Sequence, residues 1–150
     1  MLTLIRFTAL LAICYSASLA NAQQFPTKES ANSEMYCEKE WTKRGDLDQK
    51  MYKYCLDREE KGYQEALILI NKYKDQPWIQ SLIDFSVKEW TKREIRQDSM
   101  VKHSLSRNIE GWEDMNYEAK QPSYKQAKAE ACVKKWAPQY SMVSYCYKSD

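Results

Sequence analysis

The hexapeptide KEWTKR occurs twice in this chain, at residues 39–44 and again at residues 88–93. The repetition extends well beyond six residues when the chain is aligned with itself at a shift of 49. YCEKEWTKRGDLDQKMYKYCLDREEKGY at residues 36–63 then lies over FSVKEWTKREIRQDSMVKHSLSRNIEGW at residues 85–112. A period of roughly 20–50 residues is typical of stacked supersecondary units. The hexapeptide therefore marks a structural repeat.

A third, shorter copy lies in ACVKKWAPQYSMVSYCYKS at residues 131–149. It aligns with the first copy when four residues are dropped between the Trp and the Met of the first copy. Each copy then has one Trp and one Met at equivalent places, and we interpret these six residues as the core of the repeat. They are Trp41, Met51, Trp90, Met100, Trp136 and Met142.

The spacing within each copy predicts two antiparallel helices. Cys-x3-Trp and Met-x3-Cys are both i,i+4 pairs, so each pair lies on one face of a helix. Residues at the same level of an antiparallel hairpin have residue numbers with a constant sum. In each copy the Trp–Met pair has the same sum as the Cys–Cys pair, or as the Ser–Ser pair of the middle copy. No strand pattern of period two is evident. We therefore predict an all-α fold of three tandem helical hairpins, in units near residues 31–75, 78–120 and 123–149.

Four cysteines follow residue 22, and they occupy the same two positions in the first and third copies. The middle copy has Ser86 and Ser104 there, so both cysteines are absent together. Joint absence is what a bond between these positions would produce, because a lone thiol is a liability in an oxidising compartment. The predicted disulfides are Cys37–Cys55 and Cys132–Cys146. The other two connectivities stay open, whereas a four-thiolate zinc site is disfavoured because C-x2-C pairs are absent.

The first 22 residues read as a secretory signal peptide. Arg6 gives a basic start, residues 9–13 are apolar, and Ala20 and Ala22 fit the small-x-small cleavage pattern. Cys14 would indicate a lipoprotein instead, but Ile13 stands where that signal needs a small residue. We expect a single domain at residues 23–150, exported to the periplasm or the medium, with no transmembrane segment.

The third copy resembles a motif of small exported bacterial proteins of uncharacterised function, Cys-x3-Trp-Pro-x-Asp-Tyr/Phe-x-Met-x2-Tyr-Cys. It reads CVKKWAPQYSMVSYC at residues 132–146. It departs from the motif because Ala137 follows Trp136 directly, Pro138 comes one place later, and Gln139 replaces Asp. The first two copies depart further, since they lack the Pro and have four extra residues. The resemblance implies helical hairpins and export, and it implies no activity.

Local signals predict where the second helices begin. Asp46 or Asp48 is expected to cap the second helix of unit 1, because Asp accepts hydrogen bonds from the first free N–H groups of a helix. In unit 2 the candidates are Gln97 and Asp98, of which Asp is the better cap. The Lys-Arg pairs that end the repeated hexapeptide are expected at the helix C-termini, where the helix dipole favours cations.

Packing signals are equally local. Gly62 and Gly111 stand inside predicted helices, where Gly is unfavourable, so they indicate close approach of another helix. Residues 66–70 (ALILI) are apolar all round and are expected to be the most deeply buried segment. Residues 23–30 are expected to be loose.

His103 is the only histidine, and it takes the place of Tyr54 and Tyr145 in the other copies. A position filled by Tyr, His and Tyr is interpreted as a flat side chain that packs in the hairpin. A small metal or haem binder that uses His103 with Met100 is an alternative, because both are ligands of such groups.

The charge and composition exclude some functions and favour another. The sequence holds 23 Lys and Arg against 21 Asp and Glu, which argues against a nucleic-acid binder. No P-loop and no G-x-S-x-G motif occurs, and pairs such as Glu59-Glu60 are interpreted as solvated, although a hydrolytic enzyme using surface carboxylates is an alternative.

The 11 Tyr and 5 Trp are numerous for small hairpins, and exposed aromatics are typical of protein contacts. The leading hypothesis is an exported, non-enzymatic binding protein without a cofactor, whose partner is another protein of the cell envelope.

Overall fold

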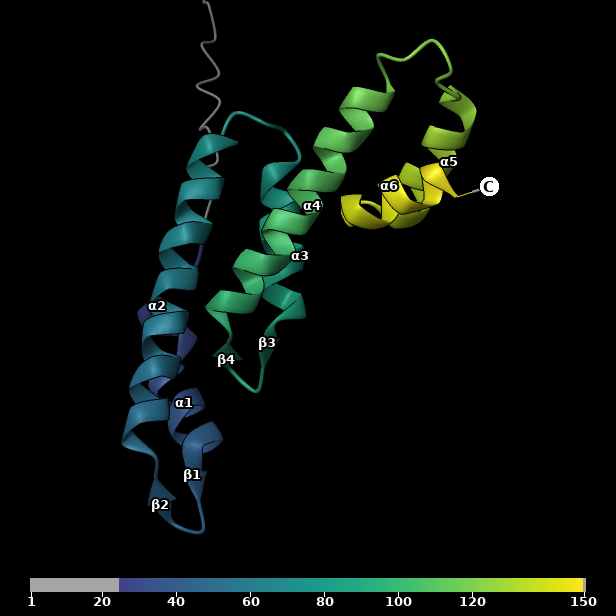
Figure 1. Ribbon diagram of the computed structural model, residues 1–150. Coiled ribbons are helices and arrows are strands. Elements are labelled where there is room, and N and C mark those ends of the chain that lie inside the picture. Colours follow the sequence, from purple (N-terminus) through teal and green to yellow (C-terminus); the bar gives the residue numbers. More distant parts are fainter. Residues whose placement is uncertain (1–24, 150) are drawn as a thin grey trace, which may run out of the picture.

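The computed structural model describes residues 25–149, so the predicted signal peptide lies outside the described residues. Within this range, 25–149, the chain forms three successive helical hairpins (Figure 1). Unit 1 comprises η1 (Glu29–Ala31), α1 (Ser33–Trp41) and α2 (Gln49–Lys72); unit 2 comprises α3 (Ile79–Glu89) and α4 (Asp98–Glu118); unit 3 comprises α5 (Gln126–Trp136) and α6 (Tyr140–Lys148). The all-α class and the three predicted hairpins are confirmed. None of the described helices is long and apolar enough to cross a membrane.

Two short β-ladders at the hairpin tips were not expected from the sequence. β1 (Thr42–Lys43) pairs antiparallel with β2 (Asp46–Leu47), and β3 (Thr91–Lys92) pairs in the same way with β4 (Ile95–Arg96). Strands of two residues are too short to produce an alternating pattern. The two residues of each turn have positive φ angles, which is typical of a tight two-residue hairpin loop. They are Arg44 (54°) with Gly45 (89°), and Arg93 (51°) with Glu94 (65°).

The repeated hexapeptide encodes the change from helix to turn. Trp41 is the last residue of α1, and the Thr42 hydroxyl then donates a hydrogen bond of 2.7 Å to the carbonyl of Glu38. The Thr91 hydroxyl does the same at the end of α3, at 2.6 Å from the carbonyl of Val87. The Lys-Arg pairs lie beyond the helix ends, in a strand and a turn. The pairs thus follow the C-termini of α1 and α3 closely, and their interaction with the helix dipole stays a prediction.

Both predicted disulfides are present. Cys37 and Cys55 are joined with an S–S distance of 2.01 Å, and Cys132 and Cys146 with one of 2.03 Å. In unit 2, the Ser86 hydroxyl donates to the Ser104 hydroxyl at 3.1 Å, and both residues are buried. A hydrogen bond therefore occupies the place that a disulfide has in the other units. These links connect the two helices of each hairpin.

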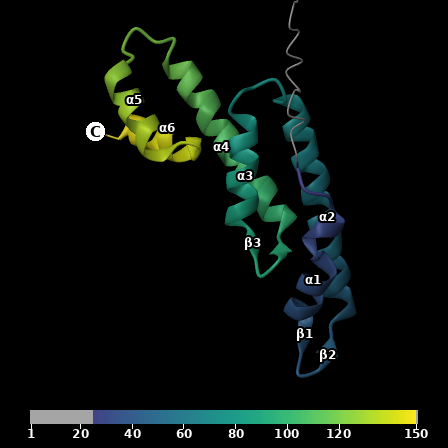
Figure 2. The same cartoon turned by 180° about the vertical axis from the view of Figure 1, so that it is seen from behind.

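The second helices stack in the order α2, α4, α6, with α5 and α6 at the far end from α1 (Figures 1 and 2). Gly62 of α2 faces Ser99, the second residue of α4, and an added Cβ would lie 2.4 Å from the Ser99 Cα. Gly111 of α4 faces the start of α6 in the same way, with 2.4 Å to the carbonyl oxygen of Tyr140. The predicted close approach is confirmed. Each second helix therefore begins about 13 residues, or ~20 Å, along the previous one, which gives a staircase.

The hydrophobic core is centred on unit 2. It is formed mainly by aliphatic residues of α3 and α4, joined by the end of α2. Its buried members are Ala66, Ile70, Tyr73, Trp78, Ile79, Leu82, Ile83, Val101, Leu105 and Ile109. Residues 66–70 are not buried all round, because Ile68 is 67% exposed. The six repeated Trp and Met residues are half-buried, and Trp90 packs against this core. The interpretation of these six residues as the core of the repeat stays a prediction.

Candidate functional site

The first turns of α4 and α6 are capped by side chains of the preceding unit. The Glu59 carboxylate accepts hydrogen bonds from the Ser99 N–H at 3.0 Å and from the Ser99 hydroxyl at 2.7 Å. Asn108, which stands at the equivalent place in unit 2, accepts from the N–H and the hydroxyl of Ser141, both at 3.1 Å. These bonds satisfy an N–H that a helix leaves free, and the Glu59 charge also complements the helix dipole. The cap thus joins neighbouring units.

Unit 1 has no preceding unit among the described residues, and α2 is capped locally. Asp48 accepts from the N–H groups of Lys50 and Met51, both at 3.1 Å, so the prediction of Asp48 as the cap is confirmed. The prediction for unit 2 was wrong. Gln97 precedes α4 but makes no capping bond with its side chain, and Asp98 is already the first residue of the helix. The cap from Glu59 makes a local one unnecessary.

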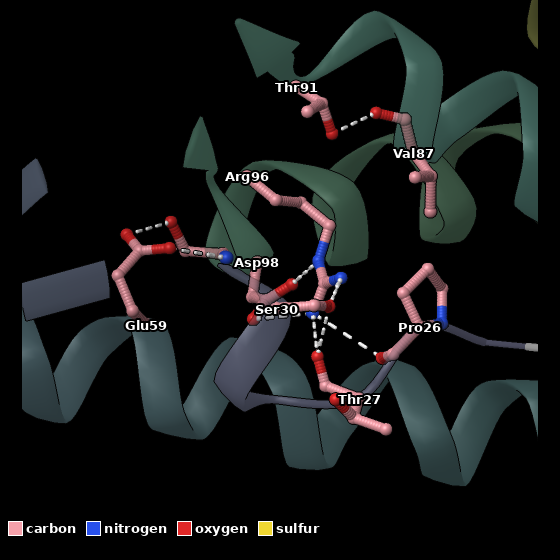
Figure 3. Close-up of polar contacts among 9 residues, drawn as sticks. Pro26, Thr27, Ser30, Glu59, Val87, Thr91, Arg96 and Asp98 are labelled. Atoms are coloured by element: carbon pink, nitrogen blue, oxygen red, sulfur yellow. Dashed lines mark hydrogen bonds and ion pairs between the residues drawn. The ribbon is translucent and has the colours of Figure 1, made fainter. Parts of the chain in front are cut away.

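A buried Arg–Asp pair lies at the junction of units 1 and 2 (Figure 3). Arg96 of β4 is 2% exposed, and its Nε donates to the Asp98 carboxylate at 2.5 Å. The other guanidinium nitrogens donate to the Ser30 hydroxyl at 3.0 Å and to the Thr27 carbonyl at 2.9 Å. Arg96 also lies over the ring of Phe25, at 5.2 Å from its centre. Residues 25–30 are therefore held in place, so the expectation that residues 23–30 are loose was wrong for this part, and residues 23 and 24 lie outside the described residues.

A cavity of about 720 Å³ opens beside this cluster. Its walls come from η1, α1, α2 and the start of α4. Six carboxylates line it, together with one Lys and an apolar patch. These residues are Lys28, Glu29, Glu34, Met35, Leu56, Asp57, Glu59, Glu60 and Asp98. The cavity wall is therefore acidic, and two of its carboxylates, those of Glu59 and Asp98, are buried.

Burial raises the pKa of the Asp98 carboxyl above its ordinary value of 3.8, the contacts with Arg96 oppose this shift, and the Glu59 charge adds to it. A raised carboxyl pKa beside a cavity is a feature of acid–base sites. Both oxygens of Asp98 contact the Arg96 guanidinium, at 2.5 and 3.3 Å, and both oxygens of Glu59 accept from Ser99. These two carboxylates therefore hold the unit junction together, and a proton on Asp98 would weaken the ion pair.

His103 lies on α4 at the junction of units 2 and 3. Its side chain is exposed, and so are those of its counterparts Tyr54 (58%) and Tyr145 (69%). The interpretation that this position packs inside the hairpin was therefore wrong. His103 lines a second cavity, of about 190 Å³, together with Trp90 and Arg107. Within residues 25–149, no group of three or more His, Cys, Asp or Glu side chains is placed to hold a metal ion.

Sequence reasoning missed Glu59, Asn108 and Arg96 as structural residues. Glu59 and Asn108 each stand three residues before the Gly at which the next unit packs. This pattern, a polar residue three places before a Gly, occurs in both copies and could have been found in the sequence. Arg96 had no such signal, because the equivalent residue of unit 1 is Leu47.

No protein-family model, no curated protein and no solved structure matches this chain. The resemblance to exported hairpin-repeat proteins therefore depends on the motif alone. By its architecture, the described chain is a tandem array of three helical hairpins, two of them linked by disulfides.

Proposed function

We propose that this chain is an exported, non-enzymatic protein that binds another protein of the cell envelope. The observation that supports this proposal most is the exposed ring at one repeat position. Tyr54, His103 and Tyr145 lie on α2, α4 and α6, and all three are exposed. Among the described residues, their side chains have no hydrogen-bond, ion-pair or ring partner. Nothing in the described fold requires an aromatic side chain there.

Tyr is enriched in protein interfaces because its ring contributes apolar area while its hydroxyl can bind either a donor or an acceptor. Further large apolar side chains are exposed elsewhere, among them Met35 (50%) and Tyr117 (65%). Single exposed apolar residues are ordinary on a protein surface. Tyr54, His103 and Tyr145 differ from such single residues because they recur at one position of the repeat. The two disulfides are compatible with an oxidising, exported setting.

A hydrolytic function is a second candidate, favoured by the raised pKa of Asp98 at the edge of the 720 Å³ cavity. A general acid there would have to release its proton to a substrate in the cavity. The Asp98–Arg96 ion pair argues against this role, because both carboxylate oxygens already accept from the guanidinium. We therefore retain binding as the proposed function.

The test of the proposed function is affinity capture from envelope and medium fractions with the oxidised protein as bait. A Tyr54→Ser/Tyr145→Ser double variant should lose a saturable partner that the unaltered protein retains. Tyr117→Ser removes an equally exposed ring at another place and should retain the partner. Equal capture by all three baits would contradict the proposed surface, and capture that survives reduction and alkylation would show that the fold is not required.

A further inference from the structure

The 190 Å³ cavity lies between units 2 and 3. Its walls come from α3, from α4 and from the start of α6 and the residue before it. Apolar atoms are contributed by Phe85, Trp90 and Met142, whereas Glu89, His103 and Arg107 contribute polar groups. At about 190 Å³ it is smaller than the pockets of drug-sized ligands, which are roughly 300–1,000 Å³, so its size limits an occupant to a small molecule.

The internal repeat provides a direct comparison for Arg107. Its counterpart in unit 1 is Arg58, which is satisfied within the chain. Arg58 donates to the Glu59 carboxylate at 3.1 and 3.2 Å, and it contacts the Tyr36 hydroxyl at 3.5 Å. The charge and the acceptors that surround this guanidinium thus all come from unit 1 itself.

Unit 2 keeps the Arg and lacks both of its partners. Asn108 stands in place of Glu59, which removes the negative charge, and Phe85 stands in place of Tyr36, which removes the hydroxyl. Within residues 25–149, no side chain or carbonyl forms a hydrogen bond or ion pair with the Arg107 guanidinium. An Arg whose internal anion is replaced, and which lines a cavity, is available to an external anion.

Two more residues of the cavity wall have a donor without an acceptor. The indole Nε1 of Trp90 is buried and has no hydrogen-bond partner, and the His103 imidazole is exposed and unpaired among the described residues. The Trp41 Nε1 of unit 1 also lacks an acceptor, so the indole alone does not distinguish the two units. The guanidinium does, because of the pair Arg58 and Arg107 only Arg107 lacks an acceptor among the described residues.

We propose that this cavity binds a small monocarboxylate with a short apolar tail. Arg107 forms the paired hydrogen bonds that a guanidinium makes with a planar carboxylate. Phe85 and Met142 supply apolar contact for the tail. Glu89, whose carboxylate accepts from the Ser104 hydroxyl at 2.9 Å, adds a negative charge to the cavity wall. That charge disfavours multiply charged anions such as phosphate.

The experiment is a titration of the oxidised full chain followed by nitrogen-15 NMR. The probes are sodium butyrate and sodium benzoate, with phosphate and chloride at matched ionic strength. The Trp90 indole N–H resonance, assigned from Trp90→Phe, should shift saturably with the carboxylates and not with chloride or phosphate. Arg107→Gln should weaken binding about tenfold or more. Arg58→Gln is the matched control at the equivalent, internally paired position and should bind as the unaltered protein does.

A second variant tests the argument from the repeat without removing the Arg. Asn108→Glu reproduces the unit 1 arrangement, in which one carboxylate both pairs with the Arg and caps the next helix, as Glu59 does. It should keep the fold and abolish carboxylate binding. Unchanged binding in Asn108→Glu or in Arg107→Gln, or equal shifts with chloride, would overturn the proposal.

Discussion

Glu94 is the residue at which the turn of unit 2 departs from that of unit 1. The corresponding residue in unit 1 is Gly45, with φ of 89°, and Glu94 adopts φ of 65°. Left-handed backbone is unstrained for Gly but costs roughly 1–2 kcal/mol for an L residue with a side chain. The repeat therefore keeps the turn geometry while one copy loses the residue that favours it.

Glu94→Gly should raise the free energy of unfolding by about 0.5–1 kcal/mol, because relief of strain exceeds the added chain entropy of Gly. The Asn32 amide donates to the backbone carbonyl of residue 94 at 2.8 Å, so this contact survives the change. The measurement is the urea midpoint at constant slope. Gly45→Glu, the reverse change in unit 1, should lower the midpoint. A lower midpoint in Glu94→Gly, or a higher one in Gly45→Glu, would contradict the argument from strain.

The Asp98 carboxyl sets a pH dependence whose sign follows from its surroundings. Its folded pKa is raised above 3.8, chiefly by burial, so the folded chain binds more protons than the unfolded chain just above that pH. The contribution of Asp98 to stability should therefore fall as pH rises from 3.8 through the folded pKa. Carbon-13 NMR titration should place Asp98 above 3.8. In the same titration Asp114, whose pKa is lowered by its hydrogen bond with Lys148, should lie below 3.8. The reverse order would contradict this prediction.

Within each hairpin, the two positions of the cysteine pattern link the first helix to the second. A disulfide in units 1 and 3 and a buried Ser86–Ser104 hydrogen bond in unit 2 lie at one level of the repeat. A hydrogen bond does not restrict the unfolded chain, whereas a covalent link does. The middle hairpin compensates with aliphatic burial, because Ile79, Leu82 and Ile83 of α3 are all nearly inaccessible.

The double variant Ser86→Cys/Ser104→Cys should form a third disulfide and stabilise the chain by about 3 kcal/mol, because it closes a loop as long as the one in unit 1. Non-reduced mass spectrometry would show the loss of the two thiol protons, and urea unfolding would give the gain. The control is Ser86→Ala/Ser104→Ala, which removes the hydrogen bond without a link. Two thiols that stay free after oxidation would show that unit 2 does not share the bridge geometry.

The whole molecule is held together by contacts that recur once per unit junction. A Gly admits the backbone of the next unit, and a polar residue one turn earlier caps its helix. The unit 1–2 junction adds the Arg96 cluster and the segment at residues 25–30. Because each unit contacts mainly its neighbours, damage at one junction should stay local, as in other linear repeats.

Gly111→Ala tests this locality. The new Cβ would meet the Tyr140 carbonyl at 2.4 Å, so α6 has to shift, at an expected cost of about 1–3 kcal/mol. Hydrogen exchange should accelerate in unit 3 and stay nearly unchanged in unit 1. Gly62→Ala should instead loosen the junction of units 1 and 2, and Lys61→Ala, which alters an exposed neighbour, should change little. Uniform acceleration along the chain in Gly111→Ala would contradict a locally coupled array.

The sequence by itself determined the hairpins, their approximate limits and both disulfides. Residues such as Cys37 and Cys55 recur at helical spacing within one unit, so a local pattern was sufficient to pair them. The two glycines of close approach were found in the same way. The tight turns at Arg93 and Glu94 were missed, because Glu has no preference for the left-handed backbone that this position adopts.

Only the tertiary structure decided how the units meet and what lines the cavities. In the sequence, Glu59 resembles the many surface carboxylates. The structure shows that its carboxylate accepts a hydrogen bond from the Ser99 N–H of α4. Arg107 and Arg58 are equivalent in the sequence repeat. Only the structure shows that the Arg107 guanidinium, next to Asn108 and with Phe85 in the same cavity wall, has no partner like those of Arg58. The physical reason is that helix caps and ion pairs between units join residues far apart in the chain. Their energy depends on burial and distance, and neither leaves a periodic signal in the sequence.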